Sequence, residues 1–201
     1  MLRLRGGIKV YLFISVVTLL ALHPMAAAAF SAYGNGTSGS PYRISTCSQL
    51  HEINSVLSAY YTLVRNLDCS GGTFSHMGTF TGTLDGQNHS IANLTIDSDG
   101  LFTHVDGGTI KNLMITSGSV GGTGYLGSFA ARATNATFNN VHSAMTVTAG
   151  GGGAYAGGIT GSMSGTSSVT KSSFSGSLTS DAYSGGIVGA MWDAGTSHCG
   201  R

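Results

Sequence analysis

Apolar residues recur in short alternating runs between residues 73 and 201, and glycine, asparagine and serine separate the runs. The segment 90–96 (SIANLTI) is echoed by 109–115 (TIKNLMI), and a looser copy follows at 137–141 (TFNNV). Alternation with a period of two is typical of strands that bury one face. The pattern predicts many short β-strands joined by tight turns.

A second recurring element is a glycine followed by a large apolar residue. It occurs at 100–102, 127–129, 157–161 (GGITG) and 185–189 (GGIVG). The apolar members recur at nearly constant intervals; they are Phe102, Phe129, Ile159 and Ile187. A repeat of about 28 residues with several strands indicates a β-solenoid, whose coils pair with the coils above and below. The alternative, an antiparallel β-sandwich, does not require self-similarity at a fixed period.

We therefore predict an all-β fold, a right-handed parallel β-helix with a short N-terminal capping α-helix. Side chains that point inward should form stacked apolar columns. The expected inward set is Ile91, Leu94, Ile96, Phe102, Ile110, Leu113, Ile115, Phe129, Phe138, Val141, Val147, Ile159, Val169, Phe174, Leu178 and Ile187.

The helical pattern lies between Cys47 and Ala59. Thr46 and Gln49 fit a capping box, and one apolar stripe follows at Leu50, Ile53 and Leu57. We expect residues 41–72 to form an N-terminal cap, because a solenoid must shield the unpaired backbone at its ends.

Residues 1–29 read as a signal peptide. Arg3, Arg5 and Lys9 precede an apolar run at 10–22 and then the small residues near position 29. A membrane anchor is disfavoured because the run is shorter than the roughly 20 residues that span a bilayer. We expect a secreted or cell-surface protein with no membrane span after cleavage, and a flexible linker at 30–40.

Export makes a disulfide between Cys47 and Cys69 the expected state of these thiols. Two buried free thiols are the alternative. Cys199 has no obvious partner. Residues 73–201 form the repeats and stop partway through a coil, so the chain is interpreted as truncated, with an uncapped C-terminal end that permits self-association.

The charge of the chain bears on one class of partner, nucleic acids. Only 8% of residues are charged, and signal removal leaves 6 basic against 8 acidic residues, a net charge of −2. That balance argues against a nucleic-acid partner. With 41% hydrophobic residues the chain should fold rather than remain disordered.

The segment 80–91 (FTGTLDGQNHSI), followed by 93–96 and 100–102, resembles the start of GLUG-repeat proteins, and 157–161 and 185–189 resemble the repeat itself. The resemblance covers roughly residues 40–190. It implies a right-handed parallel β-helix on bacterial surface or secreted proteins, often adhesin-like. Some relatives carry a separate zinc protease domain. The family implies no shared activity.

Candidate chemistry is sparse. His51 and Glu52 begin like the helical zinc motif H-E-x-x-H, but Ser55 replaces the second histidine. Asp97, Asp99 and Asp106 could bind Ca²⁺ or act as acid and base, although turn residues are the favoured interpretation. No catalytic, cofactor or metal residue is assigned.

The leading interpretation is a non-enzymatic adhesive or structural module whose partner is an unknown surface ligand, such as host matrix, a glycan or another cell-surface protein. A polysaccharide-acting β-helix enzyme is one alternative. Ice or crystal-surface binding is another, because hydroxyl rows can order water and Thr79, Thr81 and Thr83 are expected to alternate along one short strand, although these columns do not clearly continue in later coils.

Overall fold

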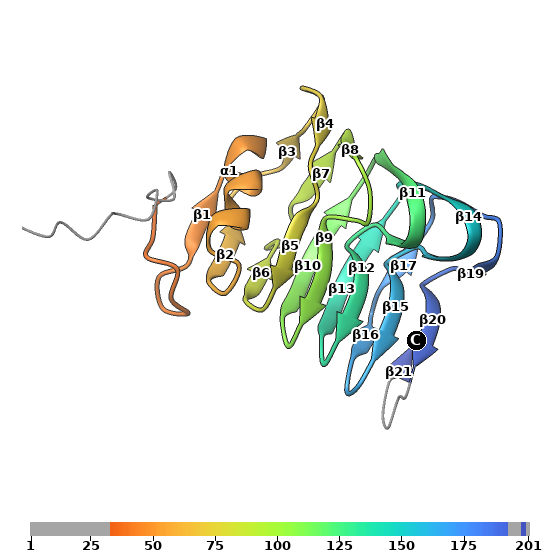
Figure 1. The fold of residues 1–201 in the computed structure, drawn as a ribbon. Coiled ribbons are helices and arrows are strands. Elements are labelled where there is room, and N and C mark those ends of the chain that lie inside the picture. The colour runs from red at the N-terminus through yellow and green to blue at the C-terminus, as the bar shows by residue number, and fades with distance from the viewer. Residues whose placement is uncertain (1–32, 193–197, 200–201) are drawn as a thin grey trace, which may run out of the picture.

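The computed structural model describes residues 33–192 and 198–199, so the expected signal peptide at 1–29 lies outside the described residues. The chain winds about one axis into a parallel β-solenoid of about four turns (Figure 1). Every strand pairing between the named strands is parallel. The predicted solenoid class is thereby confirmed, and the β-sandwich alternative is wrong.

Three parallel sheets form the sides of the solenoid in the described part of the chain. Sheet 1 consists of β1 (Tyr42–Ile44), β2 (Tyr60–Leu63), β3 (Leu67–Asp68), β6 (Thr83–Asp85), β7 (Ser90–Ala92), β10 (Thr109–Ile115), β13 (Thr137–Ser143), β16 (Ser168–Thr170), β17 (Ser173–Phe174) and β21 (His198–Cys199). Sheet 2 consists of β4 (Thr73–Phe74), β8 (Leu94–Ile96), β11 (Gly118–Gly127), β14 (Thr146–Gly157), β18 (Ser177–Ser180) and β19 (Tyr183–Gly185). Sheet 3 consists of β5 (Met77–Phe80), β9 (Phe102–Asp106), β12 (Ala130–Thr134), β15 (Thr160–Ser164) and β20 (Val188–Trp192).

The core is a set of apolar columns that run along the solenoid axis. On sheet 1, Leu84, Ile110, Phe138 and Val169 follow one another in register. All four are almost fully buried. The expected inward set is buried from Ile91 to Val169, while Phe174, Leu178 and Ile187 are only partly buried.

One predicted column is displaced by one position. Phe102 pairs in register with Ala130, not with Phe129. The residue stacked in line with Phe129, Ile159 and Ile187 is therefore Leu101, which directly precedes Phe102. The prediction that aligned Phe102 with Phe129 was wrong because the first copy has Asp99, with a φ of 63°, where later copies have glycine.

The echo between 90–96 and 109–115 does not describe stacked residues either. Ile91 pairs with Ile115, and Ile110 pairs with Leu84. The two segments look alike because each bends at an asparagine in the left-handed region, at Asn93 (φ 57°) and Asn112 (φ 52°). Asparagine tolerates that conformation better than most residues with a side chain.

The helical cap is shorter than predicted. Helix α1 spans Cys47–Glu52, the 3-10 turn η1 spans Ile53–Ser55, and the chain is no longer helical at Ala59. Thr46 accepts a hydrogen bond from the Gln49 N–H at 3.2 Å, as the capping box predicts. Long-range contacts end the helix early, since the Asn54 side chain accepts the Gly78 N–H at 3.0 Å.

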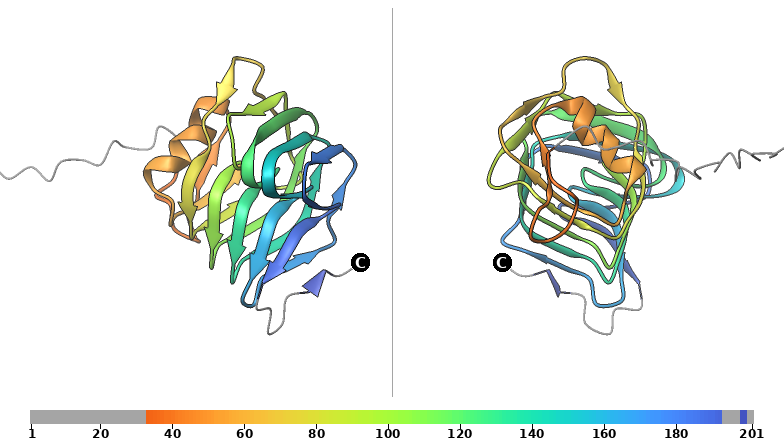
Figure 2. Two further views of the ribbon diagram at one scale, coloured as in Figure 1. Left: turned by 45° about the vertical axis from the view of Figure 1, so that its right-hand side comes forward. Right: turned by 90° about the vertical axis from the view of Figure 1, so that its left-hand side faces the viewer.

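The cap closes the N-terminal end of the solenoid (Figure 2). Leu50 and Ile53 are fully buried beneath α1 and η1. A disulfide joins Cys47 in α1 to Cys69 after β3 and links the cap to the first coil, across a sequence separation of 22. On the chain-entropy estimate a loop of this size adds about 3 kcal/mol of stability.

Glycines in the repeated motif allow the chain to fold back closely on itself. A Cβ on Gly157 would lie 2.0 Å from the Thr160 carbonyl oxygen and 2.7 Å from the Gly189 nitrogen. A Cβ on Gly161 would lie 2.6 Å from the Leu126 nitrogen. The ends of β11 and β14 therefore approach sheet 3 at backbone distance, which explains why the GGITG and GGIVG segments recur.

Replacing Gly157 by alanine should destabilise the protein by about 1–3 kcal/mol, because rigid backbone atoms occupy the space of the new methyl group. Gly186→Ala is the matched control, since nothing lies within 4 Å of its Cβ position. Urea denaturation measures both. Equal midpoints for the two variants would contradict this account of the motif.

Candidate functional site

Two of the three predicted acids converge on one histidine. His76, in the loop between β4 and β5, has Nδ1 2.8 Å from the Asp97 carboxylate and Nε2 3.9 Å from that of Asp99. The His76 N–H also donates to Asp97 at 2.9 Å. Asp106 lies apart, in β9. The cluster clamps the loops of two neighbouring coils together.

Hydrogen bonding controls the ionisation of Asp97. Partial burial alone would raise its pKa, but the N–H and ring of His76, the charge of His76 and the Ser98 N–H together hold the pKa below its usual value. The charged carboxylate is therefore the form that the fold favours. Among the described residues, no three His, Cys, Asp or Glu side chains are placed to hold a metal ion.

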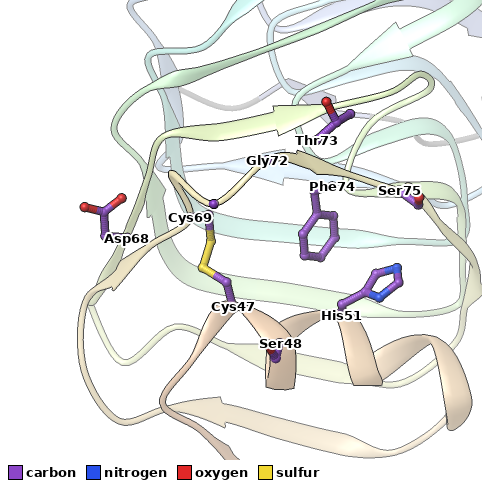
Figure 3. Close-up of a pocket in the computed structure, with 10 residues that line it drawn as sticks. Cys47, Ser48, His51, Asp68, Cys69, Gly72, Thr73, Phe74 and Ser75 are labelled. Carbon is purple, nitrogen blue, oxygen red and sulfur yellow. A yellow bond between two sulfur atoms is a disulfide. The ribbon is translucent and has the colours of Figure 1, made fainter.

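A hollow of about 370 Å³ opens beside the disulfide, between α1 and the β3–β4 segment (Figure 3). His51 packs edge-on against Phe74, with ring centroids 4.9 Å apart. Asp68 points away from this pair (Figure 3), and its pKa is lowered by hydrogen bonds from Asn93 and then Ser70. Among the residues that line the hollow, His51 is thus in ring contact with Phe74, while the acid of this set, Asp68, points elsewhere.

The most distinctive surface is a stack of tyrosine rings that sequence reasoning missed. Tyr125, Tyr155 and Tyr183 stand in register on β11, β14 and β19. Their ring centroids lie 5.1 and 4.8 Å apart, with interplanar angles of 12° and 8°. These tyrosines recur along the chain at the same intervals as the core column that begins at Phe129, so the repeat itself carried the signal.

Two further side chains extend this stack. The Arg132 guanidinium lies 5.6 Å from the Tyr125 ring centroid, within cation–π range. The Trp192 indole meets Tyr155 edge-on at 5.5 Å and remains 44% exposed. We call Tyr125, Tyr155, Tyr183, Arg132 and Trp192 the aromatic stripe. Tyrosine, tryptophan and arginine are the residues that most often dominate binding energy at interfaces.

The fold and these surfaces define a parallel β-solenoid with an aromatic stripe whose tyrosines lie on sheet 2 and whose Arg132 and Trp192 lie on sheet 3. The sequence profile of the family "M26 IgA1-specific Metallo-endopeptidase N-terminal region" matches residues 51–144, just under half of the chain. Halomucin from Haloquadratum walsbyi is 35% identical over 137 residues, which cover 57% of this chain and 2% of halomucin.

A solved structure shares the fold. The crystal structure of a provisionally assigned immunoglobulin A1 protease from Bacteroides ovatus superposes with a TM-score of 0.52 at 21% identity. The match covers 79% of this chain and 64% of that one. The chain thus spans about two thirds of that structure and a small fraction of halomucin. In the described part, no helix has the length and hydrophobicity needed to cross a bilayer.

The low pKa of Asp97 predicts acid sensitivity. A carboxyl whose pKa is depressed by folding stabilises the protein above its unfolded value of about 4 and loses that contribution as pH falls through the folded value. At about pH 6, Asp97→Asn should therefore have a lower urea midpoint than the parent chain. Below about pH 3, where Asp97 of the parent chain becomes protonated, the difference between the two midpoints should shrink. A gap that stays constant with pH would contradict the clamp.

Proposed function

We propose that this chain is a non-enzymatic, secreted or cell-surface repeat module that binds an external ligand through the aromatic stripe. The stripe carries the proposal, because its rings are held in a fixed stack by a paired sheet. Ordering the rings during folding reduces the entropy cost of binding.

We also propose that the chain is exported and that it contains GLUG-type repeats. A signal peptide at residues 1–29 would deliver the chain outside the cell, where the Cys47–Cys69 bridge is stable. Similarity to halomucin and to the M26 N-terminal region supports an extracellular module. We infer that 157–161 and 185–189 are GLUG-type repeats, with close backbone approach at Gly157 and Gly161 as the physical reason for the motif.

The ligand classes to test are glycans and matrix proteins. We expect the purified chain to bind at least one member of an array of both, and Tyr125→Ala or Arg132→Ala to weaken that binding at least about tenfold. Tyr60→Ala is the matched control, because Tyr60 is an exposed tyrosine on sheet 1, away from the stripe. Binding that is lost equally with Tyr60→Ala, or no binding to any array member, would overturn the proposal.

Binding to ice or crystal surfaces is an alternative function that would use a hydroxyl-bearing face, and we do not favour it for sheet 2. Its outward column consists of Thr73, Thr95, Ser119, Thr146 and Ser177, which are all in register. The expected Thr79, Thr81 and Thr83 row is wrong, because Thr79 lies in β5 and Thr83 in β6.

A flat hydroxyl lattice needs a second column beside the first. Here the second column places Gly121 in register with Thr148 and Thr179, so it lacks a hydroxyl in one coil. We therefore expect no thermal hysteresis in a freezing assay. If thermal hysteresis were measured and Thr146→Tyr abolished it, we would instead assign the function to this face of sheet 2.

A further inference from the structure

Arg132 carries the positive charge of the aromatic stripe. It is an exposed residue of β12, and its guanidinium lies 5.6 Å from the centroid of the Tyr125 ring. Tyr125 in turn stacks on Tyr155 at 5.1 Å, because β11 and β14 pair in register at these two residues. The cation is therefore supported by a ring whose own position is set by the strand ladder.

The charge of Arg132 is not neutralised within the described part of the chain. Lys111 on sheet 1 shows the alternative, since its Nζ lies 3.3 Å from the Asp85 carboxylate. Arg132 forms no such ion pair with a described acid, and Asp106 on the neighbouring strand β9 is exposed and does not pair with it. A guanidinium has five N–H donors in a planar fork that fits the oxygens of an acidic group. Arg132 thus presents an anion-binding group to the solvent.

A histidine and two hydroxyl groups lie beside this cation. His104 is in register with Arg132, and its Nε2 lies 3.0 Å from Thr134 Oγ1. Thr134 Oγ1 lies 2.9 Å from Ser164 Oγ on β15, so the hydroxyl groups continue into the next coil. Burial lowers the pKa of His104, against the opposing effect of Asp106, so the ring is neutral at neutral pH. Arg132 is therefore the cation of this surface, and uncharged hydrogen-bonding groups lie next to it.

The backbone at Arg132 is closed to a peptide strand. Strand β12 pairs with β9 on one side and with β15 on the other. A peptide that extends a sheet needs an unpaired edge, so a ligand at this position meets side chains alone. Phenol hydroxyls, aliphatic hydroxyls and a guanidinium together match a ligand with many hydroxyl groups and an acidic group. Acidic sugars have that chemistry.

We propose that the ligand of the aromatic stripe is an acidic polysaccharide, whose carboxylate or sulfate groups pair with Arg132 while its hydroxyls bond to those of Tyr125 and Tyr155. This inference rests on the proposed function, because it names the ligand class for the same surface. Only 8% of the residues of the chain are charged, so few other cations are available to attract a polyanion. The preference for acidic sugars should therefore depend on Arg132.

Dextran, carboxymethyl dextran and dextran sulfate test the inference, because they share one sugar backbone and differ in charge. Binding of the full chain to each immobilised polymer is measured by biolayer interferometry at low and at high salt. We expect at least about tenfold tighter binding to one or both charged dextrans than to dextran at low salt. Screening should reduce this preference at high salt. The two charged polymers distinguish a carboxylate ligand from a sulfate ligand.

Variants at position 132 separate the charge from the packing on Tyr125. Arg132→Gln should abolish the preference for charged dextran, whereas Arg132→Lys should keep part of it, because lysine retains the charge but lacks the planar fork. Arg43→Gln is the matched control, since Arg43 is an exposed arginine on β1 of sheet 1, away from the stripe, and its substitution should leave the preference unchanged. Circular dichroism establishes that each variant folds.

Equal binding to dextran and to both charged dextrans would overturn this inference and leave the proposed function standing. A preference that Arg132→Gln and Arg43→Gln reduce equally would also overturn it. So would tighter binding to polyglutamate than to either charged dextran, which would indicate an acidic protein as the ligand. If the chain binds none of the dextrans, the assignment to acidic sugars fails, and binding to other members of the glycan and matrix array decides whether the proposed function fails with it.

Discussion

The interaction on which this structure depends is the in-register stacking of apolar side chains between successive parallel coils. Each coil satisfies its backbone hydrogen bonds on its neighbours, so the ladder and the apolar columns form together. Leu84, Ile110, Phe138 and Val169 illustrate the rule, since each buries the one before it. Because the core supplies stability through burial, the sides need few charges, which accounts for a chain with only 8% charged residues.

Stacking holds only if every coil turns at the same places, and asparagine and glycine secure those turns. Asn88, Asn112 and Asn140 all adopt a positive φ. The Asn140 amide donates to Asn112 at 3.0 Å and to Asn88 at 3.2 Å, so side chains at the bends are also linked between coils. Asn93 and Asn135 also adopt a positive φ, so asparagines secure bends at several places along the coils.

Much of the fold could be predicted because the repeat and the core express the same periodicity. The solenoid class, the N-cap at Thr46 and the buried set up to Val169 follow from local pattern. The register of Phe102 and the end of α1 could not be predicted, because each depends on contacts between coils. The first copy of the repeat has Asp99 where later copies have glycine, and this difference concealed the alignment of Leu101 with Phe129. The Asn54–Gly78 hydrogen bond, which ends the helix, joins residues far apart in the sequence.

The candidate site was harder to predict, because the acidic residues match known site chemistry whereas the tyrosines match no short motif. Asp97 and Asp99 prove to clamp His76, while Tyr125, Tyr155 and Tyr183 form the ordered surface. Yet the tyrosines share the register of the core, because outward and inward side chains belong to the same strands. In a solenoid, a surface residue that recurs with the core period must stack into a row on one side. The position of such rows therefore follows from the register alone, whereas their ligand depends on side chains that the core does not constrain.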